Sequence, residues 1–217
     1  MISFSAVLFD LDGTLLDTAP DLASALNVLL QEQGRDVLPY DLIRPVASNG
    51  SAGLLGLGFG ITTEHHSYKR LQKRFLRLYQ QNLARETQLF IGMDVVLNQL
   101  EQAHIPWGVV TNKPAFLTVP IIEQLGLAQR AACIVSGDTT AFIKPDPAPM
   151  LHASELIQIP PQQCMYIGDA QRDIQAGKNA GMKTVTALYG YLSEQDKPES
   201  WQADAMINHP TDLLEWI

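Results

Sequence analysis

The chain has 217 residues, of which 46% are hydrophobic, and its mean hydropathy of +0.00 is ordinary for a soluble globular protein. Fifteen Lys and Arg residues against 23 Asp and Glu residues give a formal charge of −8 at pH 7. Because this charge repels nucleic acid and anionic membranes, neither is expected as a partner. It also repels phosphate esters, so any phosphate site needs positive charge supplied locally.

The chain has two cysteines, Cys133 and Cys164, and both lie in apolar, strand-like runs. We expect two buried free thiols in a reducing compartment, with a disulfide as the alternative. The N-terminus lacks a basic segment and a long apolar stretch, so neither a signal peptide nor a transmembrane helix is expected. These features favour a cytoplasmic protein. Nothing in the sequence indicates its oligomeric state.

Short apolar runs that end in turn signals recur along the chain, which is typical of buried parallel strands. The runs cover residues 6–9, 105–111, 133–136, 165–167, 184–188 and 205–207. Helical patterns separate most of them, as in βαβ units. We therefore predict an α/β fold, a Rossmann-like parallel sheet with helices on both faces. One of these helices is expected over 148–157, with Met150, Leu151 and Leu156 toward a core.

Residues 17–89 carry helical patterns without a clear strand. Two apolar stripes have helical spacing, formed by Leu22, Leu26, Leu29 and Leu30 and by Tyr68, Leu71, Phe75, Leu78 and Tyr79. A glycine-rich stretch, expected as a loop, lies between them. We predict a small all-helical cap domain over 17–89, inserted into a core made of 1–16 and 90–217. The cap is expected to lie over the strand ends and to close on a substrate.

Polar side chains follow four short apolar runs, each expected to end a strand. Asp10 and Asp12 follow the first run, Thr111 ends the second, Lys144 follows Phe142-Ile143, and Asp169 follows residues 165–168. Ligands of open parallel sheets bind beyond the carboxyl ends of the strands, so these side chains should share one crevice. Carboxylates, a hydroxyl and an ammonium in one crevice indicate a site for a metal and a phosphate.

The string Asp10-Leu11-Asp12-Gly13-Thr14 suits phosphoryl transfer. The carboxylate of Asp10 can attack phosphorus and form an acyl phosphate. Asp12, two residues on, can protonate the leaving group and later activate water. The alternative is an Asx turn that only caps the strand, which suits any isolated Asp-X-Asp.

Asp169 and Asp173 have a spacing that lets both reach one hard cation across a strand-to-helix turn. Magnesium prefers few carboxylates, several waters and substrate phosphate, so Mg²⁺ is the expected cofactor. By itself, Asp169 could equally be a helix N-cap.

A phosphoryl group could be held by two segments. Thr111 and Asn112 end a strand and open a helix, so the Thr111 hydroxyl and the backbone N–H groups can cradle it. Lys144 lies in a proline-rich turn, and its ammonium can neutralise phosphate charge. We favour Lys144 over Lys113 for this role and leave open whether Lys113 also contacts substrate. Each of these residues alone could be an ordinary surface group.

Together these segments resemble the four motifs of the haloacid dehalogenase superfamily, in order: Asp10–Thr14, Thr111, Lys144 and Gly168–Asp173. The resemblance implies that Asp10 is the nucleophile and Asp12 the general acid/base. It also implies that Thr111 and Lys144 hold the phosphoryl group. The implied Mg²⁺ ligands are Asp10, Asp169, the backbone carbonyl of Asp12 and, in the outer part of the site, Asp173. Dehalogenases of the superfamily lack an aspartate at the position of Asp12, so its presence favours phosphoryl chemistry.

Two groups within the superfamily are similar to this chain. Val46–Ser51 looks like the Asn-Gly cap loop of phosphoglycolate phosphatases. Because the glycine-rich loop lies in a helical insertion that starts just after the nucleophile strand, we expect Asn49, Gly50 and Ser51 nearest the leaving group. The tail, with Tyr189-Gly190-Tyr191, resembles the bacterial N-acetylmuramic acid 6-phosphate phosphatases. The expected substrate is therefore a small phosphate ester, either 2-phosphoglycolate or a phosphosugar.

The leading hypothesis is a Mg²⁺-dependent phosphomonoesterase that works through an aspartyl-phosphate. One alternative is a phosphosugar mutase resembling β-phosphoglucomutase, which shares these motifs but releases no net phosphate. Another is a non-catalytic sensor of phosphate ligands on the same fold, since fold does not fix function.

Overall fold

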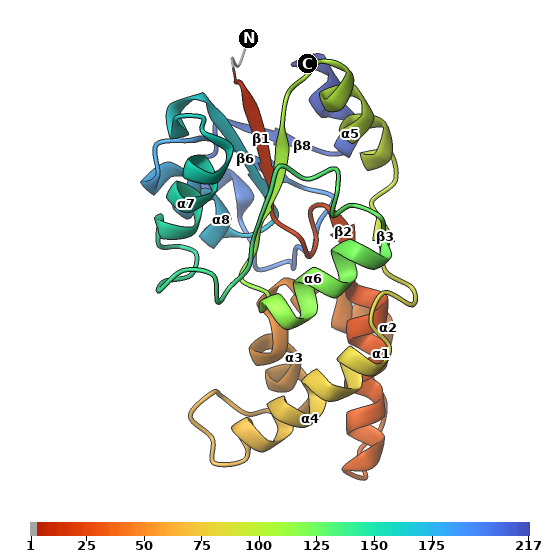
Figure 1. The fold of residues 1–217 in the computed structure, drawn as a ribbon. Coiled ribbons are helices and arrows are strands. Elements are labelled where there is room, and N and C mark those ends of the chain that lie inside the picture. The colour runs from red at the N-terminus through yellow and green to blue at the C-terminus, as the bar shows by residue number, and fades with distance from the viewer. Residues whose placement is uncertain (1–3) are drawn as a thin grey trace.

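The computed structural model describes residues 4–217. Their central element is a six-stranded parallel sheet (Figure 1). Its strands are β1 (Ala6–Phe9), β4 (Trp107–Val110), β5 (Cys133–Val135), β6 (Cys164–Gly168), β7 (Lys183–Ala187) and β8 (Ala205–Ile207). They are ordered β5-β4-β1-β6-β7-β8, so β1 and its neighbours β4 and β6 lie in the interior. The six predicted strands are confirmed, each within two residues at either end.

Helices cover both faces of the sheet, as predicted. Because side chains alternate along a strand, Val7 and Phe9 pack in one core cluster, and Ala6 and Leu8 in another. The first cluster contains side chains of α5 (Met93–Gln102) and α6 (Ala115–Gln124); the second contains those of α7 (Ala148–Ile157) and α8 (Gln171–Asn179). The short 3₁₀ helices of this part are η2 (Pro161–Gln163), η3 (Pro198–Trp201) and η4 (Pro210–Glu215). No helix in the described part of the chain has the length and apolar character needed to cross a membrane.

The packing of α7 corrects one expectation. Met150 is buried, but Leu151 and Leu156 are 40% and 51% exposed. The buried face instead includes Ala153 and Ser154, three and four residues after Met150. This is the spacing of a single helical stripe, and Leu151 lies outside it.

Both cysteines are buried and free, as expected. Burial raises the pKa of the Cys133 thiol to about 12 and that of Cys164 to about 11. Both thiols are therefore protonated at neutral pH and act as small apolar groups in the core.

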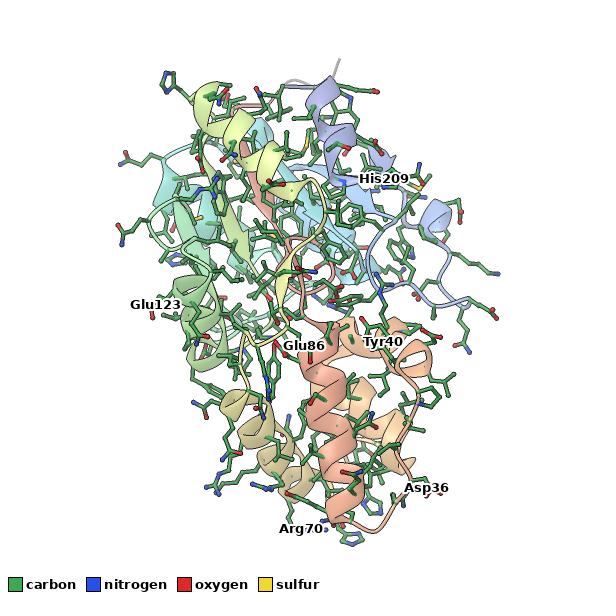
Figure 2. The ribbon with its side chains drawn as sticks, turned by 90° about the vertical axis from the view of Figure 1, so that its right-hand side faces the viewer. Asp36, Tyr40, Arg70, Glu86, Glu123 and His209 are labelled. Atoms are coloured by element: carbon green, nitrogen blue, oxygen red, sulfur yellow. The ribbon has the colours of Figure 1, made fainter. Side chains whose placement is uncertain are left out.

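A helical region is inserted after β1 and lies beyond the carboxyl ends of the strands (Figure 1). It comprises α1 (Ala19–Glu32), α2 (Tyr40–Ile43), the 3₁₀ helix η1 (Arg44–Asn49), α3 (Gly50–Phe59) and α4 (Tyr68–Gln81). Asp36 and Arg70 lie at the end far from the sheet, whereas Glu86 lies where the region meets the rest of the molecule (Figure 2). We call residues 17–89 the inserted region.

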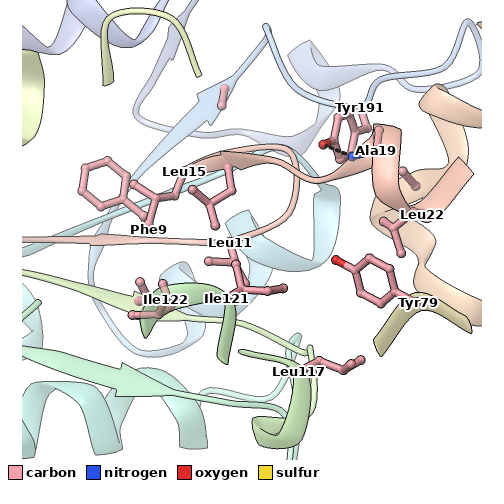
Figure 3. Close-up of a cluster of buried hydrophobic side chains, with 14 of the residues drawn as sticks. Phe9, Leu11, Leu15, Ala19, Leu22, Tyr79, Leu117, Ile121, Ile122 and Tyr191 are labelled. Carbon is pink, nitrogen blue, oxygen red and sulfur yellow. Dashed lines mark hydrogen bonds between the residues drawn. The ribbon is translucent and has the colours of Figure 1, made fainter. Parts of the chain in front are cut away.

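The two predicted apolar stripes hold the inserted region together. All nine of their residues are buried, and they belong to the same core cluster as one face of the sheet. Figure 3 shows Leu22 of α1 and Tyr79 of α4 near Leu117 of α6. The inserted region and the sheet therefore share one continuous apolar core.

The glycine-rich stretch is not a loop as expected, since Gly50–Phe59 forms α3. Leu54 and Leu55 of this helix are fully buried. A Cβ on Gly58 would lie 3.1 Å from a methyl group of Leu26, so glycine lets α3 pack closely against α1. Tertiary packing thus outweighs the low helix propensity of glycine.

A short antiparallel pair, β2 (Leu16–Asp17) and β3 (Gln88–Leu89), joins the two ends of the inserted region. Two-residue strands carry no periodic pattern, so the sequence did not reveal them. Beside this pair, the buried carboxylate of Asp21 accepts hydrogen bonds from the N–H groups of Arg85, Glu86 and Thr87. These bonds fix the chain where it returns to the sheet.

We predict opposite effects on stability for two Gly→Ala substitutions. A Cβ on Gly108 in β4 would lie 2.5 Å from Cys133 Sγ and 2.9 Å from its carbonyl oxygen, so Gly108→Ala should cost about 1–3 kcal/mol. A Cβ on Gly56 in α3 would make only an ordinary 3.7 Å contact, so Gly56→Ala should be stabilising by about 0.5–1 kcal/mol. Urea unfolding measures both. A destabilising Gly56→Ala would contradict the helical assignment of Gly50–Phe59.

Candidate active site

Lys144 lies at the centre of the strand ends with its side chain fully buried. Its ammonium contacts Asp10 Oδ1 at 2.8 Å and Asp173 Oδ1 at 2.7 Å. It also donates to the carbonyl of Val110 at 3.1 Å and to the hydroxyl of Tyr166 at 2.8 Å. Burial and the nearby Asp10 hold the pKa of Tyr166 well above its ordinary range, so the phenol is neutral. One ammonium therefore serves two carboxylates.

Asn112 fixes the main chain of Lys144. Its Oδ1 accepts the Lys144 N–H at 2.9 Å, and its Nδ2 donates to the Lys144 carbonyl at 3.0 Å. The Asn112 side chain is thus engaged within the protein, and its backbone is the part left for a ligand. The neighbouring Thr111 Oγ1 accepts the N–H of Lys113 at 3.2 Å, which leaves the hydroxyl hydrogen of Thr111 for a ligand.

Three buried carboxylates, of Asp10, Asp169 and Asp173, each place one oxygen within 4.8 Å of the others. Asp169 Oδ1 is buried without a hydrogen-bond partner in the described residues. Burial, followed by the charges of Asp173 and Asp10, raises the pKa of Asp169 to about 7. Oxygen ligands and uncompensated negative charge fit a hard divalent cation such as Mg²⁺.

Asp169 is held from two sides. Its Oδ2 accepts a hydrogen bond from Ser48 Oγ at 2.6 Å and one from the N–H of Tyr191 at 2.8 Å. Gly13, at φ +84°, approaches so closely that a Cβ there would lie 2.1 Å from the same oxygen. Only glycine fits at position 13. The hydrogen bond from Ser48 brings the inserted region into direct contact with the acidic cluster.

Asp12 lies apart from that cluster. Its Oδ1 accepts a hydrogen bond from Thr18 Oγ1 at 2.5 Å and forms an ion pair with Lys113 Nζ at 2.7 Å. Lys113 is buried, with its ammonium 4.6 Å from the centre of the Tyr79 ring. Burial alone would lower the pKa of Lys113, but Asp12 and Tyr79 together outweigh it, and the pKa lies above its ordinary value. Lys113, whose role the sequence left open, is therefore a charged partner of Asp12.

A cavity of about 640 Å³ lies between the strand ends and the inserted region. Most of the candidate residues line it, namely Asp10, Asp12, Thr111, Asn112, Lys144, Asn49, Gly50 and Ser51. Asp169 and Asp173 do not line the cavity. Each has a carboxylate oxygen within 4.8 Å of one on Asp10, and Asp173 also contacts Lys144.

Sequence reasoning missed several residues of this site. Ser48 was covered only as part of Val46–Ser51. Arg172 was covered only as part of the fourth motif, although it lines the cavity and donates to the carbonyl of Ser48 at 2.6 Å. Tyr68 and Tyr79 were assigned to an apolar stripe, yet both also line the cavity, as does Gln72. Apolar residues at helical spacing indicate a buried face of a helix, but the spacing does not show whether that face packs in the core or lines a cavity.

A parallel sheet with an acidic cluster, a buried lysine and an inserted helical region at its carboxyl edge defines a class of hydrolase, and the comparisons agree with it. Residues 7–187 match the family model of haloacid dehalogenase-like hydrolases. The chain belongs to this family.

Curated relatives are phosphatases. The chain is 45% identical to a phosphoglycolate phosphatase of Xanthomonas campestris pv. campestris, covering 97% of this chain and 95% of the relative. It is 40% identical to an N-acetylmuramic acid 6-phosphate phosphatase of Pseudomonas putida, covering 98% and 95%. The crystal structure of a predicted phosphoglycolate phosphatase from Haemophilus somnus superposes with a TM-score of 0.86 at 27% identity, covering 98% and 97%. The prediction of an enzyme of the phosphatase class is confirmed.

We predict that Asp169 makes the metal-free protein less stable as pH rises. Its pKa is about 3.8 in the unfolded chain and about 7 in the folded protein, so the folded state binds more protons between these values. The free energy of unfolding therefore falls from about pH 4 to pH 7. Asp169→Asn removes this effect and should be more stabilising at pH 8 than at pH 5, by up to a few kcal/mol.

Urea unfolding of chelator-treated protein at both pH values measures the difference. Asp36→Asn, at an exposed position of the inserted region, is the matched control and should show no such dependence. Equal pH profiles for the two variants would contradict the assignment.

Proposed function

We propose that the protein is a Mg²⁺-dependent phosphomonoesterase that hydrolyses a small phosphorylated metabolite through an aspartyl-phosphate on Asp10. The observation that carries this proposal is the contact of Asp10 with Lys144 at the edge of the cavity, beside the acidic cluster. The relatives supply two candidate substrates, 2-phosphoglycolate and N-acetylmuramic acid 6-phosphate.

In the first step, a carboxylate oxygen of Asp10 attacks phosphorus and the bond to the leaving oxygen breaks. Asp10 Oδ1 already accepts the Leu11 N–H at 2.7 Å and contacts Lys144, so we assign the attack to Oδ2. Asp12 enters this step protonated on Oδ2 and gives that proton to the leaving oxygen. Lys113 and Thr18, which both contact Oδ1, stabilise the carboxylate that remains on Asp12.

In the second step, Asp12 takes a proton from water, the water oxygen attacks phosphorus, and the bond to Asp10 breaks. Lys144 and the Thr111 hydroxyl balance charge on the phosphoryl oxygens. Mg²⁺ would be held by Asp10, Asp169, Asp173 and the main-chain carbonyl of Asp12, and it would neutralise phosphoryl charge.

We further propose that the inserted region acts as a cap domain with boundaries at residues 17 and 89. Asn49, Gly50 and Ser51 would lie nearest the leaving group, which their place in the cavity wall supports. Closure would exclude water until the acyl phosphate has formed. The buried free thiols also suit the proposed cytoplasmic location.

Asp10→Asn should abolish turnover and leave the protein folded. The amide has nearly the same shape but cannot attack phosphorus, and the ammonium of Lys144 keeps Asp173 as its partner. Phosphate release and circular dichroism test this, with Asp36→Asn as the fully active control. Turnover well above background in purified Asp10→Asn would remove Asp10 from the nucleophile role. Net phosphate release by the wild type would also exclude a mutase or a non-catalytic sensor.

Activity should require Mg²⁺, and Ca²⁺ should replace it poorly or inhibit. Calcium is larger and takes more ligands in looser geometry, which disturbs in-line transfer. Phosphate release is measured after chelation and after adding back each ion. Full activity in chelator would contradict the metal assignment of Asp169 and Asp173.

A further inference from the structure

A neutral polar cluster lies in the wall of the cavity contributed by the inserted region. Gln72 Nε2 donates to Ser51 Oγ at 2.9 Å and to the hydroxyl of Tyr68 at 3.2 Å. Within residues 4–217, Gln72 Oε1 accepts no hydrogen bond. The hydroxyls of Ser51 and Tyr68 lie 3.5 Å apart, so their mutual bond is weak. The cluster therefore offers one acceptor and two hydroxyl groups to a ligand.

Apolar side chains surround this cluster. Phe75 and Leu76, on the same helix as Gln72, also line the cavity, as does Leu22 of α1. Hydroxyl-binding groups set among aromatic and aliphatic carbon suit a ligand with hydroxyls at its edge and C–H bonds on its faces. A sugar ring has this character.

The positive charges that line the cavity come from outside the inserted region. Lys144 contacts two carboxylates, Lys113 contacts Asp12, and Arg172 donates to the main-chain carbonyl of Ser48 at 2.6 Å. Every residue of the inserted region that lines the cavity is uncharged.

The paired charges of the site lie at the strand ends. Lys144 contacts Asp10 and Asp173, and Lys113 contacts Asp12, while the divalent cation and the phosphoryl dianion of the proposed function cancel each other. The wall contributed by the inserted region offers no positive charge to a second anionic group beside the ester, and burying an unpaired carboxylate against this neutral wall is costly.

We propose that the leaving group is a hydroxylated sugar with no charge next to the ester, a hexose 6-phosphate rather than a two-carbon acid. This inference rests on the proposed function and deepens it. Gln72 accepts a hydrogen bond from a sugar hydroxyl, and Tyr68 and Ser51 donate to others. The cavity of about 640 Å³ is in the range that holds ligands much larger than a two-carbon acid.

The first test compares kcat/KM for glucose 6-phosphate, N-acetylmuramic acid 6-phosphate, 2-phosphoglycolate and p-nitrophenyl phosphate in the Mg²⁺-loaded protein. At least one hexose 6-phosphate should exceed 2-phosphoglycolate by about tenfold or more. A higher kcat/KM for 2-phosphoglycolate than for both sugars would overturn the proposal and leave the phosphatase function standing. Phosphate release from none of the four would overturn the proposed function itself.

The second test removes the cluster one group at a time. Gln72→Leu should lower kcat/KM for the preferred hexose 6-phosphate about tenfold or more and change that for p-nitrophenyl phosphate little, because the aryl ester makes no such hydrogen bonds. Gln80→Leu, the same substitution at an exposed position of α4, is the matched control and should change neither. Tyr68→Phe removes a single hydroxyl and should act in the same direction, whether or not Gln72→Leu folds.

The third variant supplies the missing charge. Gln72→Arg should raise kcat/KM for 2-phosphoglycolate relative to the hexose 6-phosphate, because it places a cation in the neutral wall. If Gln72→Leu and Tyr68→Phe lower kcat/KM equally for all esters, or for none, the cluster does not recognise the leaving group.

Discussion

The ammonium of Lys144 is the group on which the rest of the site depends. It is buried between Asp10, which follows β1, and Asp173 of α8, and it also bonds to Val110 at the end of β4 and to Tyr166 in the middle of β6. Carboxylates so close together in a low-dielectric environment repel strongly, and a buried ion pair persists only when its remaining hydrogen bonds are satisfied. The buried carboxylates of the site therefore need neighbouring cations to balance their charge. Burial, followed by the charges of Asp173 and Asp10, raises the pKa of Asp169, which Lys144 does not contact. Burial raises the pKa of Asp173 as well, although Lys144 contacts it.

The inserted region takes part in this electrostatic arrangement. Ser48 holds Asp169, and Thr18, at the entrance to α1, holds Asp12. The hydroxyl of Tyr191 accepts the N–H groups of Thr18 and Ala19 and donates to Asp17 at 2.7 Å, so the tail of the chain fixes the same entrance. A displacement of the inserted region would alter the partners of both aspartates. The proposed cap motion is thereby coupled to the state of the acidic groups.

Much of the fold could be predicted from the sequence because its signals are local. Buried strands such as Cys164–Gly168 are apolar runs ended by turn residues, and the polar residues that follow them must meet at one edge of a parallel sheet. The helical state of Gly50–Phe59 could not be predicted, because glycine has a low helix propensity and the packing against Leu26 and Leu30 is tertiary.

The same limit applies within the site. The pairing of Lys113 with Asp12 joins residues 101 positions apart, and that of Ser48 with Asp169 joins residues 121 apart. No local pattern carries such information. The strand-end positions of Asp10 and Asp169 followed from the pattern, whereas their distant hydrogen-bond and ion-pair partners did not. Lys144 lies nine residues after β5, and Phe142 and Ile143 before it form no strand.

The central claim is that Asp10 carries the phosphoryl group during turnover. A single-turnover reaction of the Mg²⁺-loaded protein with a slowly hydrolysed phosphate ester, quenched in acid and digested, measures this directly by mass spectrometry. We expect the peptide containing Asp10 to gain the mass of one phosphoryl group, which fragmentation places on Asp10. This phosphorylated peptide should disappear as free phosphate accumulates. Phosphate released without any phosphorylated protein at early times, or a phosphoryl group on another residue, would contradict this claim.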